Sequence, residues 1–139
     1  MTRINIGILP QQLCDQHLLA EHREIVRVRL IQHSKQTPNP KFNLGKGHVI
    51  FFKDKLGYIF QRYLNLLEEC RARRFNVTDM SLSFADFDCD GHFLPNSDDI
   101  QYVKVRISER LKSMKYVRYR GKNITCEEAI ELLTNYVIE

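Results

Sequence analysis

The sequence predicts a single all-α domain, because its apolar residues recur mainly at helical spacing and strand-like alternation is sparse. The chain has 139 residues, which is enough for one domain with a real core. Hydrophobic residues make up 43% and charged residues 27%, as in ordinary globular proteins. No apolar run approaches the ~18 residues of a membrane span, and no signal-peptide hydrophobic region follows the first residues. We therefore expect an intracellular, cytoplasmic protein.

Two long helices are expected in the first half of the chain. The first covers about residues 10–36, where Leu13, Ile25 and Leu30 belong to an apolar series at helical spacing. Prolines and glycines then predict a loop over residues 36–47. The second helix runs from residue 47 or 48 to residue 73 or 74, and its apolar stripe consists of Phe52, Leu56, Ile59, Tyr63, Leu66, Leu67 and Cys70.

The second half predicts one main helix and one short one. Residues 75–97 lack a sustained period and are expected to be irregular. A third helix fits residues 97–113, with Ser97 or Asp98 as its cap and an inward face of Ile100, Val103, Ile107 and Leu111. Residues 114–122 alternate aromatic and basic side chains and end at a glycine, which predicts an exposed loop. Residues 125–128 have the form of a capping box and predict a short last helix.

Charge is strongly segregated along the chain, although the formal net charge is only +4. Residues 1–75 carry 13 basic and 6 acidic side chains, whereas residues 76–99 carry six aspartates and no lysine or arginine. Residues 100–122 are basic again, and residues 123–139 are acidic. Two basic blocks in one folded chain indicate a cationic face, as expected for a polyanionic ligand such as a nucleic acid.

Two metal-site interpretations are weak. The four cysteines lie far apart with no Cys-x-x-Cys pair, which argues against a zinc site or a disulfide framework. Asp86, Asp88, Asp90 and Gly91 resemble the start of a calcium loop, but Ser97 stands where a bidentate glutamate is required. We expect an acidic surface turn and no metal. His48 and Asp54 are expected to serve in local hydrogen bonding or helix-end packing rather than catalysis.

One side of the first helix carries a candidate site. Arg23 and Arg27 are four residues apart with Glu24 beside them, and His17 lies two turns earlier on the same side. Guanidiniums bind phosphates in bidentate fashion, and a carboxylate near a sugar's anomeric carbon stabilises oxocarbenium character. The alternative is an exposed helix with ordinary intrahelical ion pairs such as Glu24–Arg27.

The N-terminus supplies a candidate nucleophile. Thr2 is small enough for methionine removal, which exposes an α-amine with an ordinary pKa of roughly 7.7–8.0. Nearby cations favour the neutral form of such an amine. It can displace a base from a deoxyribose and form an imine, after which the 3′ phosphate leaves by β-elimination. Arg3 is available from the same segment.

The residues that carry this chemistry resemble a known family. Residues 2–5 (Thr-Arg-Ile-Asn), the stretch from Asp15 to Arg27 and the stretch from Leu44 to Leu56 look like the phage pyrimidine-dimer DNA glycosylase/AP lyase family of the endonuclease V type. The resemblance runs in order from residue 2 to about residue 122.

The resemblance implies a small all-α enzyme of three main helices that acts as a monomer on double-stranded DNA containing UV lesions or abasic sites, without a metal or organic cofactor. The Thr2 amine would be the nucleophile and Glu24 the essential carboxylate. A base opposite the lesion would be flipped out. The residues expected to contact DNA are Arg3, Gln16, His17, Arg23, Arg27, Arg106, Arg110, Tyr116, Arg118, Tyr119 and Lys122.

Some features depart from the family pattern. Its C-terminal aromatic and basic loop contains tryptophan, which this chain lacks, and Val26 replaces a proline of the arginine-rich motif. Residues 123–139 extend past the matching region. Two alternatives therefore stay open: the same chemistry on another damaged or modified base, and a non-catalytic helical DNA-binding protein.

Overall fold

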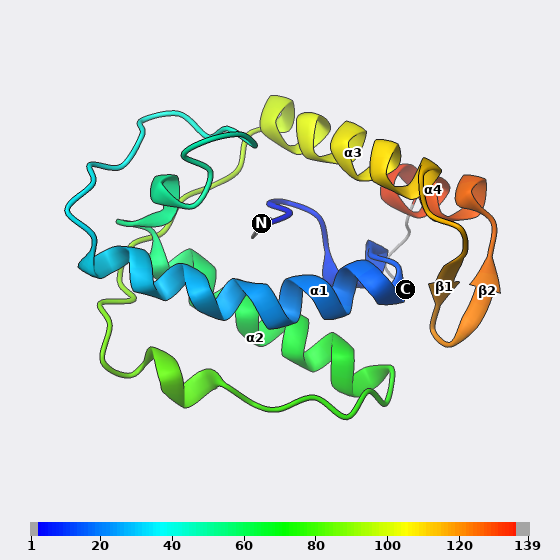
Figure 1. Ribbon diagram of the computed structural model, residues 1–139, viewed down its shortest axis with the longest axis horizontal. Helices are drawn as coiled ribbons and strands as arrows, with labels where there is room; N and C mark the ends of the chain where they lie inside the picture. Colours follow the sequence, from blue (N-terminus) through cyan, green and yellow to red (C-terminus); the bar gives the residue numbers. More distant parts are fainter. Residues whose placement is uncertain (1–2, 136–139) are drawn as a thin grey trace. The chain divides into compact units, whose positions relative to one another are not determined.

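The computed structural model describes residues 3–135, and their secondary structure is mainly helical (Figure 1). The α-helices of this part are α1 (Asp15–Ile25), α2 (Leu56–Ala72), α3 (Ser97–Lys112) and α4 (Cys126–Asn135). The short 3-10 helices are η1 (Pro10–Gln12), η2 (Val26–His33), η3 (Ile50–Phe52) and η4 (Ser81–Phe84). The strands β1 (Val117–Tyr119) and β2 (Lys122–Ile124) form an antiparallel hairpin.

The all-α prediction is right about the dominant structure and wrong about residues 114–122. The predicted exposed loop contains β1 and the turn into β2, and Val117 is only 3% exposed. The alternation of aromatic and basic residues is the period of two of a short strand. Arg120 and Gly121 form the turn with φ values of 52° and 80°, as the twist of a tight hairpin requires.

Contacts along the chain divide it into two compact units. Unit 1 comprises residues 3–4 and 21–94, and unit 2 comprises residues 5–20 and 95–135. The boundary falls within α1, whose residues 15–20 are grouped with unit 2 and 21–25 with unit 1. Each unit has apolar residues of its own in the core.

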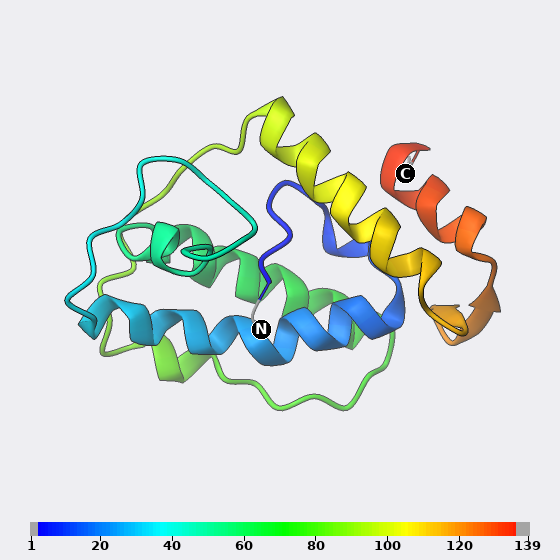
Figure 2. The same ribbon diagram turned by 45° about the horizontal axis from the view of Figure 1, so that its top comes forward.

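Unit 1 is built on α2, which packs against η2 and η4. Figures 1 and 2 both show α2 lying along η2 and the end of α1. The predicted stripe is confirmed, because Leu56, Ile59, Tyr63, Leu66 and Cys70 are fully buried. Leu30, a member of the apolar series in the first predicted helix, is 53% exposed, because that helix continues after Ile25 as the 3-10 helix η2 and the rotation per residue changes.

The second helix begins later than predicted, at Leu56 rather than residue 47 or 48. Residues 48–55 form η3 and a turn. Gly57 lies against backbone, since a Cβ there would stand 2.5 Å from the carbonyl oxygen of Gly91. Tyr58 also donates its backbone N–H to that carbonyl over 3.0 Å. The first turn of α2 thus packs against the backbone around Gly91. Hydrophobic periodicity in the sequence does not predict such a contact between backbone segments.

Unit 2 consists of α3, α4 and the hairpin, with η1 and the start of α1. α4 packs against α3 and β1 (Figure 2). α3 spans the predicted residues, but its cap is the Asn96 side chain, which accepts the Asp99 N–H over 2.8 Å. The predicted capping box of α4 is confirmed, because the Thr125 and Glu128 side chains each accept the other's backbone N–H over 3.0 Å.

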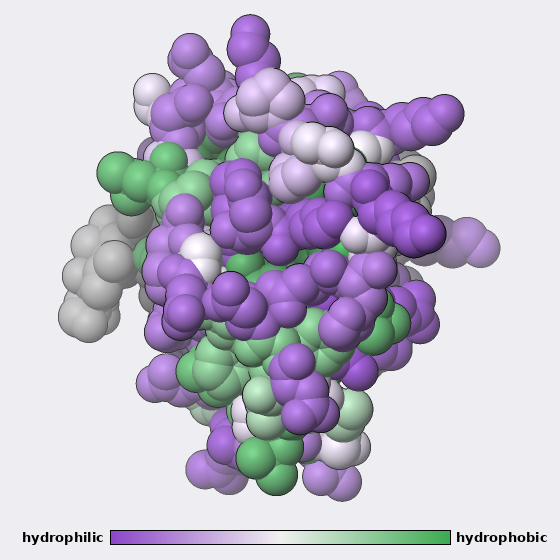
Figure 3. Space-filling model, turned by 90° about the vertical axis from the view of Figure 1, so that its left-hand side faces the viewer, coloured by the Kyte–Doolittle hydropathy of each residue, from purple (hydrophilic) through white to green (hydrophobic). Residues whose placement is uncertain are grey.

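The surface is mostly hydrophilic where Figure 3 displays it, and hydrophobic surface is broken into separate patches on that face. Among residues 3–135, no helix has the length and apolar character needed to cross a membrane.

A buried ion pair sets the packing of α1 on α2 in unit 1. Arg62 donates Nε and Nη2 to the Glu21 carboxylate, and the Nη2–Oε1 distance is 3.0 Å. The two side chains are 7% and 2% exposed. Burial acts to lower the pKa of Arg62, but the Glu21 carboxylate outweighs it and raises that pKa.

We predict that Glu21→Gln destabilises the protein by about 3–5 kcal/mol, because Arg62 then stays buried without a counter-charge. Urea unfolding followed by circular dichroism measures the change. Glu68→Gln is the matched control, since Glu68 is an exposed glutamate of α2, and it is expected to change stability by less than about 0.5 kcal/mol. Equal effects of the two variants would contradict the assignment.

Candidate functional site

Charged side chains lie exposed or half-buried at the end of α1 and the start of η2. Arg23 and Arg27 are exposed and Glu24 is half-buried, while Ile25 and Val28 face the core. Within residues 3–135, Arg23, Glu24 and Arg27 form no ion pair or side-chain hydrogen bond. The Glu24–Arg27 pair expected for an ordinary exposed helix is thus not formed here.

The start of the chain is fastened to the loop before η3 in unit 1. Arg3 donates to the carbonyl oxygen of Leu44, and the Ile4 backbone N–H donates to Nε2 of His48 over 2.9 Å. Thr2, the predicted nucleophile, lies outside the described residues.

His48 is 2% exposed and uses both ring nitrogens. Its Nδ1 lies 2.8 Å from the carbonyl oxygen of Asn43, which can only accept, so Nδ1 carries the proton and Nε2 accepts from Ile4. Burial lowers the pKa of His48 below its ordinary value of 6.5. The predicted local hydrogen-bonding role is confirmed. Asp54, by contrast, is exposed and pairs with Lys55 over 2.7 Å.

The aspartate-rich segment forms part of an acidic surface in unit 1. Asp88 and Asp90 line an open cavity of about 560 Å³ together with Lys53 and Asp54. Among residues 3–135, no three His, Cys, Asp or Glu side chains are arranged to hold a metal ion.

The hairpin of unit 2 is held by two consecutive residues at the start of α1. The Asp15 carboxylate accepts the N–H groups of Arg120 and Gly121 over 2.9 and 2.8 Å. The Gln16 amide accepts the Arg118 N–H over 3.0 Å and donates to the Tyr116 carbonyl over 3.2 Å. Gln16 was predicted to contact DNA, and its side chain is engaged with hairpin backbone.

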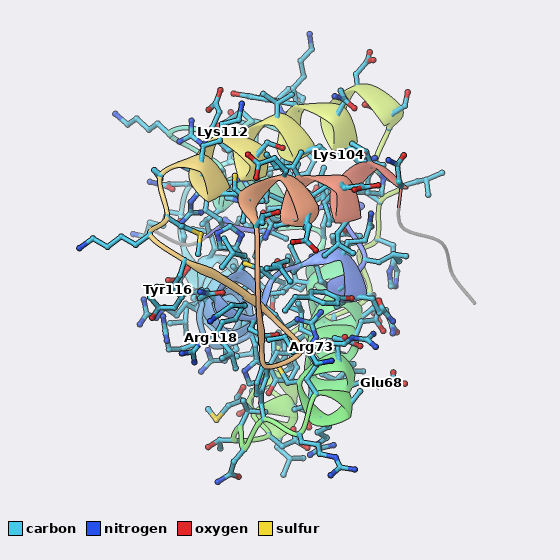
Figure 4. All side chains as sticks on the ribbon, turned by 90° about the vertical axis from the view of Figure 1, so that its right-hand side faces the viewer. Glu68, Arg73, Lys104, Lys112, Tyr116 and Arg118 are labelled. Carbon is cyan, nitrogen blue, oxygen red and sulfur yellow. The ribbon has the colours of Figure 1, made fainter. Side chains whose placement is uncertain are left out.

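The hairpin presents paired aromatic and cationic side chains. The Arg118 guanidinium lies 5.4 Å from the ring centre of Tyr116, and Arg120 lies 5.4 Å from that of Tyr119. Tyr116 is 60% exposed, and Figure 4 shows Tyr116 and Arg118 along the same edge of the view. Tyr119 is half-buried and donates its hydroxyl to the Gln11 carbonyl over 2.7 Å. Lys122 is exposed at the start of β2.

The other predicted contacts of unit 2 lie on helices. Arg106 is half-buried and Arg110 is exposed on α3, which also carries Lys104 and Lys112 (Figure 4). His17 is half-buried near the start of α1. Sequence reasoning missed Asp15, although it opens the motif that contains Gln16 and His17.

A comparison with protein families adds a direct finding. A family model described as pyrimidine dimer DNA glycosylase matches residues 1–82, more than half of the chain. The chain belongs to the pyrimidine dimer DNA glycosylase family. The match contains the N-terminal arm (residues 3 and 4), α1, η2 and α2. The family name supports a role in DNA repair. It also supports DNA that contains pyrimidine dimers as the substrate.

The matched part of this glycosylase is mostly unit 1, together with the first residues of unit 2. α3, the hairpin and α4 lie beyond residue 82. The family match therefore covers the arm and the charged end of α1 but not the hairpin that Asp15 and Gln16 hold.

We predict that Asp15→Ala lowers stability by about 2–3 kcal/mol, because the N–H groups of Arg120 and Gly121 both lose a charged acceptor. Asp98→Ala is the control, since Asp98 lies in the first turn of α3 but is exposed. Loss of the favourable helix-dipole interaction alone costs about 0.3–1 kcal/mol. Urea unfolding compares the variants, and a similar loss in both would refute the hairpin-holding role.

Proposed function

We propose that this glycosylase excises the damaged base at cyclobutane pyrimidine dimers and then cleaves the resulting abasic site through an imine formed by the α-amine of Thr2. Glu24 is the essential carboxylate. The observation that supports this best is that Glu24, Arg23 and Arg27 are not paired with one another or with other described side chains. These three charged groups form no ion pair within residues 3–135, and they belong to the same compact unit as Arg3 and Ile4.

The first step replaces one bond at the sugar by another. The neutral Thr2 amine attacks C1′ of the damaged nucleotide, and the C1′–N bond to the base breaks with its electron pair leaving on the base. The sugar ring then opens as the amine nitrogen and C1′ form an imine. The ring oxygen takes up a proton and becomes a hydroxyl group.

The second step cleaves the strand. The cationic imine makes the C2′ proton acidic, and removal of that proton shifts the electron pair toward C3′. The 3′ phosphate departs with the electrons of its C–O bond. Glu24 is suited to both steps, because a carboxylate stabilises positive charge at C1′ and then assists proton transfers.

The cationic side chains bind and position the DNA. Arg3, Arg23 and Arg27 serve the strand near the reacting sugar through phosphate contacts. From unit 2, His17, Arg106, Arg110, Arg118 and Lys122 are further DNA contacts, and the rings of Tyr116 and Tyr119 are surfaces on which bases stack. Gln16 contributes chiefly by holding the hairpin backbone in place.

Borohydride trapping tests the mechanism. Untagged protein is incubated with duplexes that carry a single thymine dimer, an abasic site or no lesion, and borohydride reduces any imine to a stable amine. We expect covalent complexes with the first two duplexes, and peptide mapping should place the adduct on Thr2. Trapping on the abasic duplex alone would indicate that the glycosylase step acts on a damaged base other than the thymine dimer. No trapping at all would favour a DNA-binding protein without catalysis.

Glu24→Gln and an N-terminal extension test the two catalytic groups separately. We expect each to reduce strand cleavage at a dimer by at least about 100-fold while leaving DNA binding within a few-fold, because each removes a reacting group and not a phosphate contact. Glu68→Gln is the matched carboxylate control and should cleave at the normal rate. Normal cleavage by both altered proteins would exclude the imine mechanism.

Binding to damaged DNA should weaken steeply with salt, because each arginine–phosphate contact releases counterions. We expect Arg23→Ala and Arg27→Ala each to reduce the slope of log K against log salt by about one. Fluorescence anisotropy titrations at several salt concentrations measure it. Arg71→Ala is the control, because Arg71 is an exposed arginine of α2 that pairs with Asp79 over 3.3 Å. An unchanged slope in Arg23→Ala and Arg27→Ala would remove both residues from the interface.

A further inference from the structure

We propose that His48 is the positioning residue for the N-terminal arm, and that it holds the arm only while its imidazole is neutral. The arm here means residues 3 and 4, to which Thr2 is covalently attached. The proposal rests on the amine chemistry proposed above and adds the residue that fixes where the amine is and a pH at which the arm is released.

The geometry around Ile4 carries the proposal. The Ile4 N–H donates to His48 Nε2 over 2.9 Å, both residues are buried, and Ile4 is 0% exposed. Two extended residues span at most about 7 Å, so a fixed Ile4 nitrogen sets the greatest distance at which the Thr2 amine can lie from it. A hydrogen bond at this point therefore restricts the nucleophile through the covalent chain.

The surroundings of His48 fix the orientation of its ring. Asn43 accepts from Nδ1 over 2.8 Å, and the rings of Phe42 and Phe52 meet the imidazole edge-on at centroid distances of 5.4 and 5.5 Å. Arg3 donates to the carbonyl of the neighbouring Leu44, so the same short loop holds two consecutive arm residues. Asn43 in turn closes its loop by accepting the Gly45 N–H over 3.1 Å.

Protonation would convert this acceptor into a donor. A protonated Nε2 carries a hydrogen and faces the Ile4 N–H, so the bond is lost and two donors oppose each other. Burial and the Arg3 guanidinium lower the pKa of His48, against the Asn43 carbonyl and the charge of Glu21. Glu21 itself is paired with Arg62. Protonation therefore requires a pH below the ordinary histidine range.

The sign of the pH effect follows from this lowered pKa. The unfolded chain binds a proton at His48 near pH 6.5, whereas the folded protein binds it only at lower pH. The stability contributed by the arm contact is thus fully present above about pH 6.5 and is lost as the pH falls through the folded-state pKa. The Thr2 amine also protonates on acidification, so two protonations reduce the rate.

The decisive comparison is His48→Gln against His48→Leu. Glutamine accepts from Ile4 and donates to Asn43 but does not titrate, whereas leucine does neither. In the wild type, the plot of log trapping rate on abasic DNA against pH should steepen toward a slope of two in acid, and in His48→Gln it should stay near one. His48→Leu should trap about 10- to 100-fold more slowly at every pH, with DNA affinity within about threefold.

His22→Gln is the matched control, because His22 is also buried on unit 1 and burial also lowers its pKa, but it stacks on Tyr63 at 5.2 Å. It should keep the steep acid slope of the wild type. Melting temperatures of all variants identify the pH range in which each is folded, and rates are compared only there.

Hydrogen exchange of the Ile4 amide, followed by NMR, measures whether the Ile4–His48 hydrogen bond is formed. This measurement does not depend on catalytic activity. The protection factor of the Ile4 amide should fall in the wild type as the pH drops through the folded-state pKa of His48, which lies below 6.5, and should stay constant in His48→Gln. Equal acid slopes of the trapping rate in wild type and His48→Gln would overturn the proposal. So would an Ile4 amide whose protection changes neither with pH nor in His48→Leu. Absence of trapping in the wild type would instead overturn the amine mechanism, while the Ile4 amide still decides whether His48 holds the arm.

Discussion

The buried pair between Glu21 and Arg62 is the constraint on which the candidate site of unit 1 depends. Two buried charges tolerate little displacement, because a lost partner leaves an ion without solvation. The pair therefore fixes the rotation of α1 against α2, with Ile25 and Val28 on the same buried side. Arg23 of α1 and Arg27 at the start of η2 are both exposed. The ion pair is itself buried, yet it helps to determine which charged residues of α1 are exposed.

Unit 2 uses a carboxylate in a different way. Asp15 binds two backbone N–H groups at a turn whose residues both have positive φ, and Gln16 binds the strand leading into it. A two-stranded hairpin is only marginally stable by itself. Hydrogen bonds from the start of α1 supply the missing support, so the Tyr116 and Arg118 side chains are presented from a fixed backbone. The hairpin backbone thus depends on residues that precede it by about a hundred positions.

The sequence predicts the helices, their buried stripes and the α4 capping box, because these depend on neighbours within one turn. It places the start of α2 too early, because the apolar series that predicts the helix continues back into η3, where Phe52 lies. It misses the hairpin because two three-residue strands are too short for alternation to stand out. For the candidate site, sequence patterns select Arg23, Glu24 and Arg27. They do not reveal Asp15 or the acceptor role of His48, because both act on backbone groups distant in sequence.

A charged His48 would have two opposing effects on a nearby amine. Its positive charge would lower the pKa of the amine, but it could no longer accept the hydrogen bond from Ile4 that positions the arm. A cation near an amine lowers its pKa, and a shift from about 8 to about 7 would raise the neutral fraction at pH 7 roughly fivefold. A nucleophile displaced by about 1 Å, however, can lose roughly 100-fold in rate. For His48, keeping the arm in place therefore matters more for the rate than the lower amine pKa that a positive charge would give. Arg3, whose charge does not depend on pH in this range, can depress the pKa of a neighbouring amine without sacrificing the acceptor that holds Ile4.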